Sequence, residues 1–273
     1  MGTSGAWGGS GGRAWGRVRG DTSRLLSNPT PDAASALLPA LSTAMDWLDA
    51  DGAASDEHDA PSRLAPLPVG PGWGTATAAR GAGARGSGGT ASSGRGRGSG
   101  GSGARAGGGG RSRARAATVG GRVLAAGLAY ERGDADGLRD LGLDLNQLQS
   151  LSSGRRMNTI LNALVGADGG VEEMELRAVN SRVLRAILVD GLDGIAAVRL
   201  YIVEYVMQVY ASEAGEALEG GPQRVEAERQ VRSALTSRVG QLALPDGLAT
   251  APELKTAIDG ALRLMRRLLK GSA

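Results

Sequence analysis

His58 is the one histidine of the chain, and it lies among three acids, Asp56, Glu57 and Asp59. Imidazole and carboxylate groups are ligands that divalent metals accept, so this run could hold a metal weakly. A metal site also needs ligands fixed by a rigid frame and by hydrogen-bonding neighbours. Because the surrounding sequence predicts a disordered segment, we expect a solvated polar loop here, with no metal site and no bound cofactor.

Two further patterns could serve catalysis. Glu172, Glu173 and Glu175 form a carboxylate cluster, but no histidine accompanies it, and acids suit the positive end of a helix dipole. The glycine runs at 8–12 and 98–110 contain GxG patterns, yet neither lies between a strand and a helix with a lysine after it, as a phosphate-binding loop requires. Both patterns have structural explanations, and the sequence predicts that the chain is not an enzyme.

An acid-free basic segment is the third chemical feature. Residues 60–117 contain nine arginines and no acid, and several arginines precede glycine as in RNA-binding tails. Arginine attracts phosphate with a strong salt dependence. Single-strand binders usually add aromatic stacking platforms, and none occurs between Trp73 and Tyr130. A solvated linker and a nucleic-acid contact both remain open. The residues that would make the contact are Arg95, Arg97, Arg111, Arg113 and Arg115.

The start of the chain offers an amine. Removal of Met1 would expose the amine of Gly2 on an unhindered, glycine-rich tail. Glycine lets the backbone approach another protein closely, as an enzyme acting on a protein N-terminus requires. Trp7 and Trp15 could anchor the tail on a partner, since exposed tryptophans are costly. Myristoylation would call for serine or threonine at position 6, where the chain has Ala6.

Composition limits how much of the chain can fold. Glycine accounts for 46 of 273 residues and aromatic residues for 3%, so one core cannot extend over the whole length. The lack of cysteine excludes disulfides, thiolate zinc sites, iron–sulfur clusters and a cysteine nucleophile. The most apolar segment, 195–212, is too short and too charged to span a membrane. We therefore expect a cytoplasmic protein without membrane contact.

The elements that must carry these features divide the chain into four parts. Residues 1–20 predict a flexible tail, and residues 51–117 a disordered linker rich in proline, glycine and arginine. Apolar residues at helical spacing within 21–50 indicate a short amphipathic helix, docked or transient, although Pro39 falls inside the pattern. Residues 118–272 predict an all-α domain of six or seven helices, with 195–212 as its central buried helix.

The opening of the chain resembles the QatB proteins of the bacterial Qat anti-phage defence system. The resemblance lies in Met1-Gly2-Thr3-Ser4 and in Trp7 followed by the run Gly8-Gly9-Ser10-Gly11-Gly12. The helical stretch from Leu151 to Leu192, with its Gly169-Gly170 turn, is similar to the domain of that family. An aromatic such as tyrosine is typical where Trp7 stands, which is a mild departure.

That resemblance implies a non-catalytic protein encoded beside an ATPase, a QueC-like enzyme and a TatD-like nuclease. A QueC-like enzyme activates a carboxylated 7-deazaguanine with ATP. The resemblance implies that this enzyme joins the deazaguanine to the amine of Gly2, or of a later glycine if the tail is trimmed. The helical domain would dock the enzyme or the ATPase. The partner-binding tail would comprise Thr3, Ser4, Trp7, Gly8, Gly9, Gly11 and Gly12.

Overall fold

The computed structural model describes residues 12–45, 113–166, 170–218 and 223–270. Every regular element in these ranges is an α-helix, and none of their residues forms a strand. The described helices belong to one unit of the chain. The prediction of an all-α fold is therefore confirmed, whereas the predicted tail up to residue 11 and the predicted linker from 51 to 112 lie outside the described residues.

The first helix, α1, runs from Gly12 to Ser27, so the prediction of a flexible tail over residues 1–20 is wrong for residues 12–20. Each interior glycine disfavours a helix by about 1 kcal/mol relative to alanine. The helix forms nevertheless because Trp15, Val18 and Leu25 recur on one face and are buried. Burying each large apolar side chain contributes about 1.5–3 kcal/mol, which outweighs the cost of the glycines.

The second helix, α2, spans Pro31–Met45 and is the amphipathic helix predicted within residues 21–50. Thr30 caps it by accepting a 3.2 Å hydrogen bond from the backbone of Ala33, and Pro31 suits the first helical position. Pro39 lies inside the helix without ending it. The helix is docked and not transient, since Leu37, Leu38 and Leu41 are all fully buried.

Helix α4 spans Arg113–Arg132 and begins before the boundary predicted at residue 118. Its first residues belong to the helix because Ala116 and Ala117 are buried and Arg113 and Arg115 bind carboxylates of other helices. The helix ends at Gly133, as predicted, where a φ of +68° suits glycine.

Three short or medium helices follow. They are α5 (Ala135–Asp140), α6 (Leu145–Ser150) and α7 (Ser153–Leu164). Asp134 and Asp144 cap α5 and α6 by accepting hydrogen bonds from the backbone N–H of Gly137 and Gln147. Because α5 and α6 are separate, the described residues from 113 to 270 hold eight helices instead of the predicted six or seven.

Helices α8 (Val171–Asp190) and α9 (Gly194–Leu218) form the middle of the domain. The prediction of a buried central helix is confirmed, because α9 buries the consecutive residues Tyr201, Ile202 and Val203, which point to different sides of the helix. The helix packs against α1, α4 and α8. A helix that is apolar on all sides must be buried on all sides.

The last two helices are α10 (Arg224–Gly240) and α11 (Ala251–Lys270). The glutamate half of the capping box predicted for α11 is present, since Glu253 accepts a 3.0 Å bond from the backbone N–H of Thr250. The predicted apolar face of α11 is also confirmed. It is fully buried at Leu254, Ile258, Met265 and Leu269. On α10, Val225 was expected on the apolar face but is 80% exposed.

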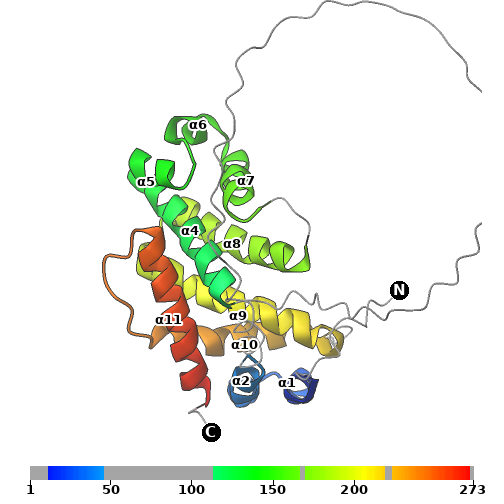
Figure 1. The fold of residues 1–273 in the computed structure, drawn as a ribbon. Helices are drawn as coiled ribbons and strands as arrows, with labels where there is room; N and C mark the ends of the chain where they lie inside the picture. The colour runs from blue at the N-terminus through cyan, green and yellow to red at the C-terminus, as the bar shows by residue number, and fades with distance from the viewer. Residues whose placement is uncertain (1–11, 46–112, 167–169, 219–222, 271–273) are drawn as a thin grey trace, which may run out of the picture. The chain divides into compact units, whose positions relative to one another are not determined.

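Close backbone approach joins α4 to α11, which lie side by side in Figure 1. A β-carbon added at Gly121 would lie 2.7 Å from the backbone nitrogen of Lys255 and 2.9 Å from the carbonyl oxygen of Ala251. At the preceding residue, a β-carbon added to Gly120 would lie 2.5 Å from the ring of Tyr201 in α9. Gly121 thus lets the backbones of α4 and α11 approach closely, and Gly120 leaves room for the Tyr201 ring.

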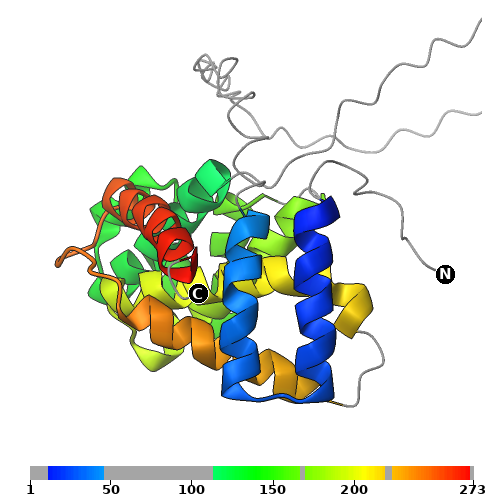
Figure 2. The ribbon, with the colours of Figure 1, turned by 90° about the horizontal axis from the view of Figure 1, so that it is seen from below.

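Figure 2 shows α1 and α2 side by side across α9 and α10. Helix α2 also packs against α11. We call α1 and α2, residues 12–45, the N-terminal hairpin, and α4–α11 the body. The hairpin thus lies against α11, although residues 46–112 separate it from the body in sequence.

Candidate functional site

The predicted tail joins the described structure at Gly12, the first residue of α1. The other predicted tail residues lie outside the described residues. They are Gly2, Thr3, Ser4, Trp7, Gly8, Gly9 and Gly11. The same holds for Arg95, Arg97, Arg111 and His58, so the described part of the candidate site consists of the beginning of α1 and of Arg113 and Arg115.

Trp15 holds the beginning of α1. Its side chain is only 7% exposed and belongs to the same apolar core as Val18 one turn later. The expectation that an exposed Trp15 awaits a partner is therefore wrong, because the chain itself buries this ring. The spacing of Trp15, Val18 and Leu25 carried that signal in the sequence.

Polar contacts fix α1 on α9. Thr22 donates from Oγ1 to the carbonyl of Val18 at 2.7 Å, and its Oγ1 lies 3.2 Å from the hydroxyl of Tyr210. Because the single hydroxyl hydrogen of Thr22 points to Val18, the Tyr210 hydroxyl is the donor. Burial raises the pKa of Tyr210 above its ordinary value of 10.0, so the phenol keeps the proton that it donates.

A third contact is close to the tail. The Nε of Arg19 donates to the carbonyl oxygen of Glu213 in α9 at 3.2 Å. Gly2 precedes Gly12 by ten residues. Ten residues span at most about 35 Å, so covalent geometry keeps the Gly2 amine within that distance of the anchored start of α1.

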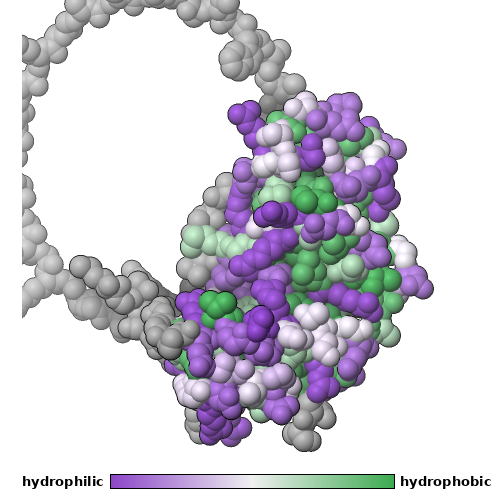
Figure 3. All heavy atoms as spheres, turned by 180° about the vertical axis from the view of Figure 1, so that it is seen from behind, coloured by the Kyte–Doolittle hydropathy of each residue, from purple (hydrophilic) through white to green (hydrophobic). Residues whose placement is uncertain are grey.

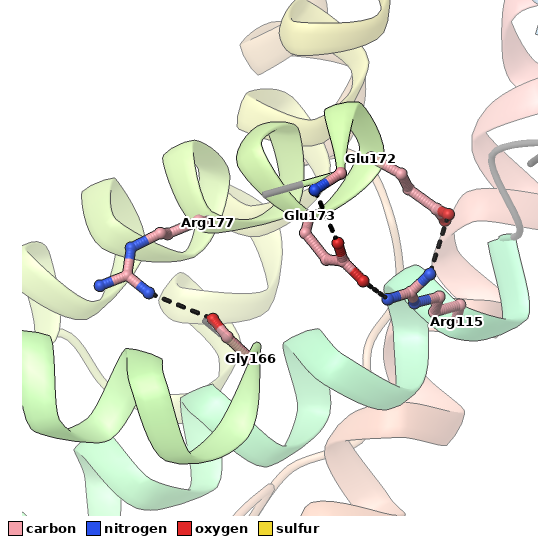
Figure 4. A network of polar contacts seen from close by, with 6 residues as sticks. Arg115, Gly166, Glu172, Glu173 and Arg177 are labelled. Carbon is pink, nitrogen blue, oxygen red and sulfur yellow. Dashed lines mark hydrogen bonds and ion pairs between the residues drawn. The ribbon is translucent and has the colours of Figure 1, made fainter. Parts of the chain in front are cut away.

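Arg115 joins the beginning of α4 to the beginning of α8 (Figure 4). Its guanidinium contacts Glu172 at 3.0 Å and Glu173 at 2.6 Å, and Glu173 also accepts a 3.0 Å bond from the backbone of Gly170. The bond from Arg115, followed by that from Gly170, holds the pKa of Glu173 below its ordinary value of 4.5. Beside this network, Arg177 donates to the carbonyl of Gly166 at 3.3 Å.

Arg113 makes an equivalent contact on the other side of α4, where its Nε lies 2.8 Å from Oδ1 of Asp259 in α11. Two of the five arginines predicted to contact nucleic acid are thus paired with carboxylates of the body. A phosphate group would have to displace Asp259 from Arg113, or Glu172 and Glu173 from Arg115. Both arginines have a structural role that the sequence did not reveal.

One buried carboxylate was not predicted from the sequence. Glu204 is 4% exposed and lies between Arg182 of α8 and Arg232 of α10. Arg182 contacts Oε2 of Glu204 at 2.9 Å, and Arg232 contacts Oε1. The sequence did carry a signal for this cluster, namely an acid within its most apolar segment. A carboxylate buried there needs cationic partners, so arginines could have been expected beside it. The cluster ties α8, α9 and α10 together.

The surface of the body carries an open groove of about 590 Å³. Its walls come from the loop 243–248 and from residues 252–264 of α11, and they are mainly apolar. On the face shown in Figure 3, hydrophobic residues are interspersed among hydrophilic ones. No group of three or more acids, histidines or cysteines suited to a metal occurs within the described ranges.

No helix among residues 12–45, 113–166, 170–218 and 223–270 has the length and hydrophobicity needed to cross a membrane. No protein-family model, no curated protein and no solved structure matches this chain.

Proposed function

We propose that this chain is a non-catalytic component of a bacterial anti-phage defence system and that its N-terminus is a substrate for a partner enzyme. The enzyme is QueC-like and activates the carboxyl group of a 7-deazaguanine with ATP. The amine of Gly2, or of a later glycine after trimming, attacks the activated carbonyl carbon. An amide forms, and the activating group leaves. The body docks the enzyme or the ATPase of the same system.

One observation carries this proposal, namely the attachment of a glycine-rich segment to a helix that is fixed at its first turn. Trp15 is buried within one turn of Gly12, and Arg19 and Thr22 hold α1 against α9. A substrate segment attached to such a helix stays near any enzyme that docks on the body. Proximity of this kind raises the effective concentration of the reacting amine.

The composition of the segment agrees with this role. More than half of residues 2–12 are glycine, and this run carries the resemblance to the QatB start. Glycine can enter a narrow groove in backbone conformations that other residues cannot adopt. An amine without a neighbouring β-carbon also meets little steric resistance as it approaches an acyl carbon.

Intact-mass measurement tests the proposal. The full chain is co-expressed with the genes adjacent to its own, and in a parallel culture the QueC-like gene is omitted. We expect an added deazaguanine acyl group only when that enzyme is present. An unmodified chain in the presence of all neighbours would refute the proposal.

A pair of variants separates the tail from the fold. Trp7→Ala changes the predicted partner-binding tail, and we expect it to lower the modified fraction. Ser23→Ala is the matched control, because Ser23 is exposed on α1. The control is expected to be modified as fully as the unaltered chain.

A further inference from the structure

The N-terminal hairpin reaches the body entirely through contacts between residues that are distant in sequence. The bonds from Arg19 to Glu213, from Tyr210 to Thr22 and from Ser42 to Arg266 join residues separated by 194, 188 and 224 positions. The last of these places Ser42 Oγ 2.8 Å from the carbonyl oxygen of Arg266 in α11. The hairpin is thus held on three helices of the body, α9, α10 and α11.

The hairpin contributes an almost purely apolar surface to this contact. It buries one aromatic and several aliphatic side chains, each at most 7% exposed. They are Trp15, Val18, Leu25, Ala34, Leu37, Leu38, Leu41, Ala44 and Met45. Most of the binding free energy of a helical pair comes from such burial, which needs no covalent connection.

Beside the core that it shares with the hairpin, the body has contacts among its own helices. Between α4, α8, α9 and α11 it buries Leu124, Leu184, Tyr201 and Ile258 completely. The Tyr201 hydroxyl donates to the carbonyl of Ala116 at 2.7 Å, which links α9 to α4. These contacts involve no hairpin residue, so the departure of the hairpin does not remove any of them.

We propose that the N-terminal hairpin is a separable module that the α9–α11 surface binds as an intramolecular ligand, and that this surface accepts the hairpin of a second copy of the chain. The occupant is identified by fit, since the paired helices α1 and α2 already cover this surface with their buried apolar side chains. The proposal stands on the fold and is independent of the proposed modification.

The length of the connection determines which hairpin is bound. The entropy cost of closing a chain grows slowly with its length, so residues 46–112 permit docking within one chain. A covalent connection makes the docking of a chain's own hairpin an intramolecular event, which favours it over the hairpin of another copy. Once the connection is cut, that advantage disappears and hairpins from different copies compete equally. In an exchanged pair, the residues before Gly12 of one copy are attached beside the body of the other.

Cleavage of the connection in the full chain tests the proposal. A protease site is inserted between Ser87 and Gly88, and the purified protein is cut under native conditions. We expect the two fragments to elute together in size-exclusion chromatography. Mixing with a nitrogen-15-labelled copy cut in the same way should then give hybrid complexes in native mass spectrometry. Separation of the fragments after cleavage would overturn the proposal, as would a stable complex that forms no hybrids over several days.

Two variants of the labelled copy show whether the apolar face of α2 carries the binding. Leu37→Asp places a carboxylate in a fully buried position. It should weaken hybrid formation by more than about tenfold, because an unpaired buried charge is costly. Ala36→Asp adds the same charge at the exposed neighbouring position and should exchange as the unaltered hairpin does. Equal exchange by both variants would contradict the assignment.

Discussion

The hydroxyl groups of Tyr210 and Thr22 lie 3.2 Å apart in the buried contact between α9 and α1. The two residues are 188 positions apart, so this bond forms only when the hairpin docks. Thr22 donates its own hydrogen to Val18, and Tyr210 donates to Thr22. The pair is therefore a direct reporter of hairpin docking.

Removal of the two partners should have unequal effects on the free energy of unfolding. Thr22→Val leaves the Tyr210 hydroxyl buried without an acceptor, and we expect a loss of about 1–3 kcal/mol. Tyr210→Phe removes the donor, while Thr22 keeps its bond to Val18, so about 0.5–1.5 kcal/mol should be lost. Urea unfolding of both variants measures the difference. If the two hydroxyl groups are in contact, the double variant Thr22→Val/Tyr210→Phe should be no less stable than Thr22→Val alone. Strict additivity of the two losses would contradict the contact.

Gly121 should tolerate no side chain. Gly121→Ala would bring a β-carbon to 2.7 Å from the backbone nitrogen of Lys255, so α4 and α11 must separate. We expect thermal unfolding to show a loss of about 1–3 kcal/mol, which exceeds the helix propensity that alanine adds.

The control for this substitution is Gly20→Ala in α1, where nothing lies within 4 Å of the added β-carbon. Since Gly20 is exposed in a helix, alanine should stabilise the protein by up to about 1 kcal/mol. Stabilisation by both substitutions would show that α4 and α11 are not in close backbone contact.

The pKa of Glu173 should depend on Arg115. The hydrogen bond from Arg115 and that from Gly170 hold this pKa below 4.5 in the folded protein. The carboxylate therefore contributes stability above pH 4.5, the ordinary value, and this contribution is lost as the pH falls through the lower folded pKa. Arg115→Gln should raise the pKa of Glu173, as NMR titration of its side chain would show.

Glu253 is an internal control in the same titration. Hydrogen bonds from the backbone N–H groups of Thr250 and Ala249 lower its pKa. Because Arg115 has no part in that cap, Arg115→Gln should leave the pKa of Glu253 unchanged. A parallel rise at both glutamates would indicate general loss of structure.

Individual arginines of the segment 60–117 should differ in how much they contribute to the binding of nucleic acid. We expect weak association with single-stranded RNA at low salt, since residues 60–117 hold nine arginines and no acid. Replacing Arg95, Arg97 and Arg111 with glutamine should reduce this affinity. Arg113→Gln should instead lower stability, because it breaks the 2.8 Å contact with Asp259. Equal loss of affinity from Arg113→Gln would show that phosphate displaces Asp259.

The sequence predicted those elements whose stability is local or strongly periodic. The end of α4 at Gly133, the cap made by Thr250 and Glu253, and the buried α9 all follow from local chemistry or from hydrophobic spacing. Helix α1 could not be predicted from composition, because its glycines favour coil and the burial of Trp15, Val18 and Leu25 in the shared core reverses that preference. The partners of Arg113, Arg115 and Glu204 likewise could not be predicted, because they lie on other helices and are brought near only by tertiary packing.

The most direct test of the proposed function is the mass of the N-terminal tryptic peptide. Trypsin cleaves after Arg13, which releases residues 2–13 from the chain co-expressed with its genomic neighbours. Fragment ions should place the mass of the deazaguanine carboxylic acid, less one water, on the α-amine of Gly2 or of a glycine exposed by trimming. A peptide with a free amine at every glycine terminus, recovered in the presence of the active QueC-like enzyme, would contradict the account.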